Sequence, residues 1–351
     1  MLRLIDANLD RAAEGLRVLE DIARFLLNDQ QLTTQAKNLR HGLLVSGLRF
    51  HKQLLCSRNA AEDIGLAIST VDELKREDIS AIAIANSRRV QESLRVIEEF
   101  AKLPSAPIGL DFAKLERTRF LTYRLEQQLV LKLARHETVS RLTGLYFILD
   151  TQMLDGRDCT EVASQAIEGG ATTIQLRDKD YSRASLLNLA KDLKRICVEK
   201  KALFIVNDHL DIALSVEADG LHLGQNDLPI PEARRLLPLD KIIGCSTATA
   251  DEARQAEMDG VDYVALGSIY PTTSKDTFRL AGLERLQQVT QTVTVPVVAI
   301  GGINESNVEK VIQAGANAVA VISAISKDKD VAAAARRLTT KIANAIAMRD
   351  G

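Results

Sequence analysis

The amino-acid sequence predicts two domains of different classes: an all-α helical domain over residues 1–138 and a (β/α)8 TIM barrel, an α/β fold, over residues 139–351. Three observations predict this division. The chain of 351 residues is longer than one hydrophobic core usually serves. Its first part shows helical spacing of apolar residues and an internal repeat. After about Ser140, short β-rich runs alternate with helical segments, which is typical of a parallel barrel.

The first domain is predicted to consist of helices joined by short loops. Apolar residues recur at helical spacing over residues 7–25, and Asn8 is the expected N-cap of that helix. Further helices are expected at about 69–77, 79–103 and 112–138, with a loop at 57–65. Two prolines, Pro104 and Pro107, separate the last two helices, because proline cannot continue a helix.

Residues 8–20 and 86–98 form an internal repeat in which Asn, Arg, Glu, Leu, Arg, Val and Glu match at corresponding positions. Two copies are too few for a solenoid, so the repeat predicts two similar helices of one bundle. Each copy carries a row of charges three residues apart, listed here by copy: Arg11, Glu14 and Arg17; Arg89, Glu92 and Arg95. Such a row suits ion pairs along the helix. The alternative is an anion or partner site built from the four arginines.

Eight β-rich runs, each followed by a helical segment, predict the barrel. The strands are expected at residues 144–149, 171–176, 202–206, 220–223, 241–244, 263–266, 295–300 and 318–322. The helices are expected at about 159–168, 183–199, 208–216, 230–236, 249–258, 282–290, 304–314 and 331–348. In a barrel of this kind, functional side chains lie at the carboxyl ends of the strands.

Composition excludes several classes of protein. The net charge of −2 gives no nucleic-acid footprint and no polybasic membrane anchor. Tryptophan is absent and aromatic residues are 4% of the chain, which argues against base-stacking platforms. The four cysteines are scattered and are expected to be reduced thiols of a cytosolic protein. No apolar run suits a signal peptide or a membrane span, so we expect a cytoplasmic protein.

The second expected strand leads into an amide and two cations at alternate positions, Gln175, Arg177 and Lys179. Alternate residues of a strand face the same side. Arginine holds phosphate as a fork and lysine as a point charge, so this pattern suits a ligand rich in anionic oxygens. The alternative is a solvated loop.

Two carboxylates follow the third and fourth strands, Asp208 and Asp227. Strand neighbours bring them to one rim, where two carboxylates without nearby His or Cys favour Mg²⁺ completed by water and phosphate oxygens. Taken separately, Asp208 is equally suited to an N-cap and Asp227 to a turn before Pro229. His209 and His222 are interpreted as structural, because no spacing supports metal ligation.

The remaining strand ends are rich in small and hydroxylic residues. Ser246 follows the fifth strand, as a ligand donor or as the start of a helix cap. A polar loop after the sixth strand suits closure over an anion and contains Thr272, Thr273, Ser274 and Lys275. Gly301 and Gly302 follow the seventh strand, and Ser323 follows the eighth. Backbone N–H groups at these two strand ends are the recurrent phosphate site of such barrels.

Residues 143 to about 345 resemble thiamine-phosphate synthase along their whole length. The motifs that carry the resemblance occur in the family's order: Gln175-Leu176-Arg177-Asp178-Lys179, Asn207-Asp208, Ala218-Asp219-Gly220-Leu221-His222-Leu223-Gly224-Gln225-Asn226-Asp227, Tyr270-Pro271-Thr272-Thr273-Ser274-Lys275, Ala299-Ile300-Gly301-Gly302-Ile303 and Val321-Ile322-Ser323. The first 138 residues resemble the extension fused to this enzyme in some bacteria. Ser274 stands where the family often has threonine, and the loop after Lys275 is about one residue shorter.

The resemblance implies a reaction between two small molecules. The family joins 4-amino-2-methyl-5-hydroxymethylpyrimidine diphosphate to 4-methyl-5-(2-phosphoethyl)thiazole, with or without a carboxylate on the thiazole, and releases pyrophosphate. It implies that the pyrimidine diphosphate is bound by Gln175, Leu176, Arg177, Asp178, Lys179, Asn207, Ser246 and Lys275. It implies that the thiazole phosphate is bound by Thr272, Thr273, Ser274, Gly302, Ile322 and Ser323. Asp208 and Asp227 would hold Mg²⁺.

The implied chemistry is a dissociative displacement, which needs no nucleophile activated by a base. Pyrophosphate leaves from the pyrimidine methylene, and the thiazole nitrogen attacks the resulting cation. Arg177, Lys179 and Lys275 would act catalytically by neutralising the departing pyrophosphate. Two alternatives stay open: a related thiazole tautomerase, which needs no diphosphate cluster, and a ligand sensor without catalysis.

Overall fold

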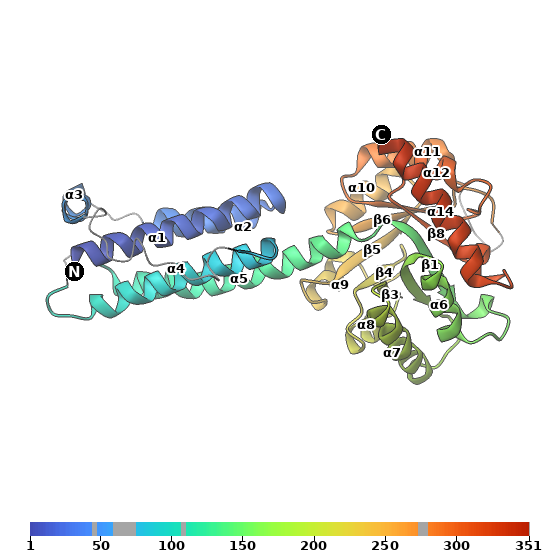
Figure 1. Ribbon diagram of the computed structural model, residues 1–351, viewed down its shortest axis with the longest axis horizontal. Coiled ribbons are helices and arrows are strands. Elements are labelled where there is room, and N and C mark those ends of the chain that lie inside the picture. The colour runs from blue at the N-terminus through green and yellow to red at the C-terminus, as the bar shows by residue number, and fades with distance from the viewer. Residues whose placement is uncertain (44–47, 59–74, 107–109, 273–279, 351) are drawn as a thin grey trace. The chain divides into compact units, whose positions relative to one another are not determined.

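A computed structural model describes residues 1–43, 48–58, 75–106, 110–272 and 280–350. The chain divides into two compact units, Met1–His136 and Glu137–Gly351, close to the predicted boundary at residue 138. The first unit consists of helices and the second contains a barrel of strands surrounded by helices (Figure 1). Within the described residues, no helix is both long enough and apolar enough to span a membrane.

The first unit, here called the bundle, is built from long amphipathic helices. Its elements are α1 (Leu2–Asp21) with a short π-helical continuation (Ile22–Leu26), α2 (Gln30–Gly42), α3 (Leu48–Ser57), α4 (Ile79–Ala101) and α5 (Phe112–Ser140), which continues into the second unit. Asp29 and Asp78 cap α2 and α4, each accepting a hydrogen bond from a backbone N–H of the first turn. The caps fix where these two helices begin.

Two predictions for this unit need correction. Asn8 is not an N-cap, because α1 begins at Leu2 and the Asn8 side chain donates to the carbonyl of Leu4 at 2.9 Å. The apolar face extends further upstream than expected, and Ile5 is fully buried. Of the helix expected at 69–77, residues 75–77 are described and are not helical, and the remainder lies outside the described residues. The expected loop at 57–65 is likewise described only at Ser57, which ends α3, and at Arg58.

The internal repeat corresponds to α1 and α4, which pack closely together. A Cβ on Gly15 would come within 2.7 Å of Val90 Cγ2 and 2.9 Å of the carbonyl oxygen of Asn86. The first asparagine of each copy makes the same contact, since Asn8 donates to Leu4 and Asn86 donates to Ile82, both at 2.9 Å. The repeated sequence therefore folds into two equivalent helices, as the pattern predicts.

The repeated charges form ion pairs, but with other partners than the expected row. Arg17 contacts Glu20 at 3.3 Å and Asp21 at 3.2 Å, and Arg95 contacts Glu98 at 3.3 Å and Glu99 at 2.6 Å. The last glutamate of each copy, Glu20 or Glu98, is buried and also faces an arginine of another helix. Arg40 of α2 contacts Glu20 at 2.9 Å, and Arg119 of α5 contacts Glu98 at 2.7 Å.

Within the described residues of the second unit, eight parallel strands close into a barrel in which each strand pairs with its neighbours in sequence. The strands are β1 (Gly144–Asp150), β2 (Ala171–Arg177), β3 (Leu203–Asn207), β4 (Gly220–Leu223), β5 (Ile242–Thr247), β6 (Tyr263–Gly267), β7 (Val297–Ile300) and β8 (Ala318–Val321). The predicted TIM barrel is confirmed. β7 begins after Pro296, because proline has no N–H for the sheet.

The helices of the barrel follow the strands in the expected order. They are α6 (Cys159–Glu168), α7 (Arg183–Glu199), α8 (Leu210–Ser215), α9 (Ile230–Leu236), α10 (Ala250–Met258), α11 (Gly282–Thr292), α12 (Val308–Gln313), α13 (Ser323–Ser326) and α14 (Val331–Asp350), with a 3-10 turn (Thr151–Met153) after β1. α12 begins four residues later than expected. Its first expected residue, Asn304, accepts from the backbone N–H of Ser306 at 2.9 Å and thereby closes a turn.

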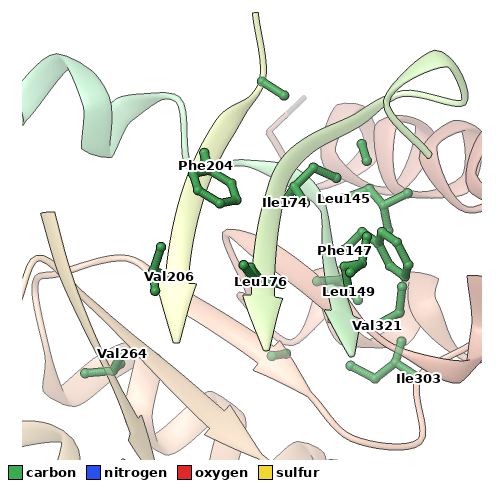
Figure 2. Close-up of a cluster of buried hydrophobic side chains, with 14 of the residues drawn as sticks. Leu145, Phe147, Leu149, Ile174, Leu176, Phe204, Val206, Val264, Ile303 and Val321 are labelled. Carbon is green, nitrogen blue, oxygen red and sulfur yellow. The ribbon is translucent and has the colours of Figure 1, made fainter. Parts of the chain in front are cut away.

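Two layers of apolar side chains hold the barrel together. The outer layer lies between strands and helices and includes Phe147, Leu176, Phe204 and Val264 (Figure 2). The inner layer, facing the barrel axis, includes Tyr146, Ile205 and Tyr263. Alternate residues of each strand face opposite layers, so β1 contributes Phe147 outward and Tyr146 inward. This alternation decides which side chains reach the interior.

Candidate active site

A pocket lies inside the barrel and is lined by inward-facing residues of every strand. Its residues are Tyr146, Ile148, Gln175, Arg177, Asn207, His222, Ser246, Tyr263, Ala265, Val298, Ile300, Ala320 and Ile322. Five of them, Gln175, Arg177, Asn207, Ser246 and Ile322, are among the residues predicted from the sequence to bind substrate. The barrel therefore brings together five predicted side chains that are far apart in the sequence.

A chain of hydrogen bonds crosses this pocket. Gln175 Nε2 donates to the Tyr146 hydroxyl at 2.8 Å, and this hydroxyl lies 3.0 Å from that of Tyr263. His222 continues the chain, with Nδ1 at 3.0 Å from the Tyr263 hydroxyl and Nε2 at 2.9 Å from Ser246 Oγ. Burial raises the pKa of both tyrosines well above the ordinary value, so both hydroxyls stay neutral. The chain presents donors and acceptors to a polar ligand.

Gly244 makes room for this chain. A Cβ at this position would overlap the ring of Tyr263, which lies on the neighbouring strand opposite Gly244. The Tyr263 ring also stacks on His222 with the ring centroids 5.6 Å apart. A residue with a side chain at position 244 would therefore displace the ring that connects Tyr146 with His222.

Arg177 is the last residue of β2 and Lys179 lies in the loop that follows, and the two cations have different environments. The Arg177 guanidinium pairs through Nη1 with the Asp150 carboxylate, and 13% of the Arg177 side chain and 5% of the Asp150 side chain are exposed. Lys179 is exposed and forms no ion pair with any residue that the structure describes. One cation is thus fixed by a carboxylate, and the other is available to a ligand.

Leu176 and Asp178, which alternate with Gln175, Arg177 and Lys179, do not point into the pocket. The Leu176 side chain is buried in the outer apolar layer, so the prediction for this residue can hold only for its backbone. The Asp178 carboxylate accepts hydrogen bonds from Thr151 Oγ1 and from the backbone N–H groups of Asp180 and Tyr181. Asp178 therefore holds the loop after β2 in place, and a direct contact with substrate stays a prediction.

Asp208 and Asp227 follow β3 and β4, which pair with each other at Asn207 and His222. Asp208 is not an N-cap, because His209 occupies that position of α8. Asp227 does close a turn, since its Oδ2 accepts from the Gly224 N–H at 2.6 Å. Two carboxylates at one rim fit a hard cation that takes its other ligands from water and phosphate. No group of three or more His, Cys, Asp or Glu suited to a metal occurs among the described residues.

The loops after β6 and β7 lie against each other. The N–H of Tyr270 donates to the Gly301 carbonyl at 2.9 Å, and a Cβ on Gly302 would come within 2.5 Å of the Pro271 carbonyl oxygen. Thr272 directly follows Tyr270 and Pro271, the two residues that pack on Gly301 and Gly302. α13 begins directly after β8 at Ser323. Three predicted residues, Thr273, Ser274 and Lys275, lie outside the described residues.

Comparison with known proteins agrees with this geometry. The family described as thiamine monophosphate synthase matches residues 145–325. The chain is 38% identical to a thiamine-phosphate synthase of Synechocystis sp. over 343 residues, covering 97% of this chain and 96% of that protein. It is 40% identical to a thiamine-phosphate synthase of Thermosynechococcus vestitus over 341 residues, covering 97% and 94%. The chain belongs to the thiamine-phosphate synthase family.

The similarity to known proteins extends over both parts of the chain. A solved thiamine phosphate pyrophosphorylase from Pyrococcus furiosus is 38% identical, with a TM-score of 0.55, and covers 59% of this chain and 98% of its own. A second family, described as the ThiD2 family, matches residues 3–128, which is most of the bundle. Because the two curated relatives match over nearly the full chain, the two-part architecture is common to them.

Four side chains of this site are not predicted from the sequence: Tyr146, Tyr263, His222 and Asp150. Tyr146 and Tyr263 lie inside apolar strands and were not distinguished from core residues. His222 was interpreted as structural, yet its ring lines the pocket and bonds to Ser246. Asp150 was overlooked although it directly follows the strand expected at 144–149. The signal for all four was present: polar groups at inward strand positions, or at a strand end, face the interior of a barrel.

Proposed function

We propose that this protein is a thiamine-phosphate synthase. It would join 4-amino-2-methyl-5-hydroxymethylpyrimidine diphosphate to 4-methyl-5-(2-phosphoethyl)thiazole and release thiamine phosphate and pyrophosphate, acting as a transferase in thiamine biosynthesis. The observation that carries the proposal is the convergence of Gln175, Arg177, Asn207 and Ser246 on one interior pocket. This support is independent of the nearly full-length similarity to curated synthases.

The pocket offers each part of the pyrimidine diphosphate a chemically suitable partner. An aminopyrimidine ring carries both donors and acceptors, and the hydrogen-bonded chain from Gln175 to Ser246 supplies both. The diphosphate would lie toward the rim, where Arg177 and Lys179 provide positive charge. This orientation places the methylene that loses pyrophosphate between the ring subsite and the cations.

The described residues supply charge and position rather than a nucleophile. Pyrophosphate would depart from the pyrimidine methylene, with its developing charge stabilised by Arg177 and Lys179 and by Lys275, which lies outside the described residues. The aminopyrimidine would stabilise the cation, and the thiazole nitrogen would attack it. Neutral tyrosines at the pocket floor neither add charge next to this cation nor take protons from it. The thiazole phosphate would lie at the β6, β7 and β8 loops, near Thr272, Gly302 and Ser323.

We also propose that Asp208 and Asp227 bind Mg²⁺, which would supply further positive charge to the diphosphate. The support is a pair of carboxylates that follow two strands paired with each other, at one rim of the barrel. A cytoplasmic location is proposed as well. It is supported by four free cysteines, of which Cys197 and Cys245 are buried.

The test is a coupling assay with the two purified substrates, followed by detection of both thiamine phosphate and pyrophosphate. The expected result is stoichiometric formation of both products, which also separates the synthase from a ligand sensor and from a thiazole tautomerase. Asp208→Ala and Asp227→Ala should each abolish most turnover while leaving the circular dichroism spectrum unchanged. Full activity in excess chelator would refute the Mg²⁺ assignment, and absence of both products would refute the synthase.

A further inference from the structure

We propose that the segment Asp150–Gln152, here called the β1 strip, is a positioning device that aims Arg177 and Lys179 at the diphosphate. The proposal rests on the proposed function and adds residues to it, since none of the three belongs to the sequence-predicted site. The β1 strip consists of the last residue of β1 and the first two residues of the 3-10 turn that follows it.

The β1 strip contacts the end of β2 at successive positions. Asp150 and Arg177 are the last paired residues of the two strands, and their side chains form an ion pair. Thr151 Oγ1 donates to the Asp178 carboxylate, and Gln152 Nε2 donates to the Asp180 carboxylate. Residues 177, 178 and 180 are thus each held by the β1 strip. Lys179, between them, has an exposed side chain that makes no ion pair with any described residue.

Two of the three contacts, those of Asp150 and Asp178, are themselves supported by a second set of hydrogen bonds. The other Asp150 oxygen, Oδ1, accepts the backbone N–H of Gln152 at 3.1 Å, which fixes the carboxylate plane. The other Asp178 oxygen accepts from the N–H groups of Asp180 at 3.0 Å and Tyr181 at 2.6 Å. A loop held at three of four successive residues keeps the backbone of the fourth in place. The Lys179 side chain is therefore directed by its neighbours rather than by contacts of its own.

The negative charge of Asp150 distinguishes a positioning role from simple electrostatic attraction of the ligand. A carboxylate beside Arg177 reduces the positive charge available to a diphosphate, so electrostatic attraction alone favours a neutral residue here. An arginine has five N–H donors, and the Asp150 contact uses Nη1. The remaining donors are then held in one orientation, without the loss of side-chain freedom that a flexible arginine suffers on binding. If Asp150 positions Arg177, removing the carboxylate weakens diphosphate binding. If only charge matters, removing it strengthens diphosphate binding.

The first experiment measures binding of inorganic pyrophosphate by calorimetry to the wild type, Asp150→Asn and Asp192→Asn. Asp192 is exposed on α7, and its replacement removes an equal charge away from the strand ends. We expect Asp150→Asn to bind pyrophosphate about 10-fold more weakly, because an unrestrained Arg177 loses side-chain freedom when it binds the anion. Asp192→Asn should bind it as the wild type does. Unchanged or tighter binding by Asp150→Asn would overturn the proposal.

The second experiment is a double-mutant cycle on turnover with Asp150→Asn, Arg177→Ala and the double variant, each checked for thermal unfolding. If Asp150 acts through Arg177, its replacement lowers kcat about 10-fold in the wild type and has little further effect once Arg177 is absent. A purely structural role would give equal losses in both backgrounds and would overturn the proposal. An inactive wild type would refute the synthase assignment, whereas the pyrophosphate measurement would still decide the role of the β1 strip.

Discussion

In the bundle, the buried carboxylates Glu20 and Glu98 each face the guanidinium of an arginine on a second helix, Arg40 or Arg119. At the rim of the barrel, Arg177 has the Asp150 carboxylate as its partner, whereas Lys179 is exposed without an ion-pair partner in the described part of the chain. The same residue types therefore serve two purposes. In the bundle they join helices, and at the barrel rim positive charge is left available to a ligand.

The largest effect is expected on turnover when the exposed cation of the barrel rim, Lys179, is removed. Lys179→Ala should lower the rate of the chemical step about 10²–10³-fold, because a preorganised charge next to the departing pyrophosphate is lost. The free energy of unfolding should stay unchanged, since the Lys179 side chain is exposed. Single-turnover kinetics and thermal unfolding measure the two quantities. Lys191→Ala, an exposed lysine on α7, is the matched control and should leave both unchanged.

In the bundle, an effect of similar size is expected on the free energy of unfolding rather than on turnover. Among the described residues, Arg119→Leu would leave the fully buried Glu98 carboxylate paired with Arg95, which is about half exposed. Breaking a buried pair costs about 3–5 kcal/mol, and the remaining arginine places this case near about 3 kcal/mol. Urea unfolding followed by circular dichroism measures the loss, and Arg117→Leu, at an exposed position of the same helix, is the control. Equal stability of both variants would show that the Glu98 contact is not a structural pair.

Sequence pattern was sufficient for the barrel because its signals are local and repeated. Each strand is a short apolar run followed by a helix, and α6, α7 and α9 have the predicted bounds. The errors lie where a side chain competes with the backbone: Asn304 closes a turn, so α12 begins at Val308. In the bundle, α2 and α3 were not delimited and Asn8 was assigned to a cap, since amphipathic spacing marks a helix better than it marks the end of one.

The site was predictable where polar residues stand near the carboxyl end of a strand, and it was missed where they lie among the apolar residues of a strand. Gln175, Arg177, Asn207 and Ser246 were found because polar residues at strand ends of a barrel converge. Tyr146 and Tyr263 are within apolar strands, so only the register of the closed barrel shows that their hydroxyls meet, 3.0 Å apart. The partnership of Asp150 with Arg177 likewise depends on strand register, which no single-strand pattern contains.

A smaller effect is expected from two glycines, one in each region, that differ in how tightly they are packed. Gly244→Ala in the barrel should destabilise the protein by about 1–3 kcal/mol, because the new methyl group overlaps the Tyr263 ring. Turnover should fall as well, since displacement of this ring breaks the chain from Tyr146 to His222. Thermal unfolding and kcat measure the two effects. Gly42→Ala in α2 meets nothing within 4 Å and should be neutral or slightly stabilising.

The smallest effect is expected for the repeated arginines of the bundle, and it decides between the two interpretations of the repeat. Arg17 and Arg95 are about half exposed, with 49% and 53% of their side chains accessible, and their acidic neighbours along the helix are the contacts expected of a structural role. Ion pairs of this exposure contribute about 0–1 kcal/mol, because water and salt screen them. The double variant with Arg17→Gln and Arg95→Gln should therefore unfold within about 1 kcal/mol of the wild type and keep full turnover. The buried glutamates would retain Arg40 and Arg119. Unchanged stability together with altered turnover, or with loss of a bound anion, would instead assign this arginine face a function.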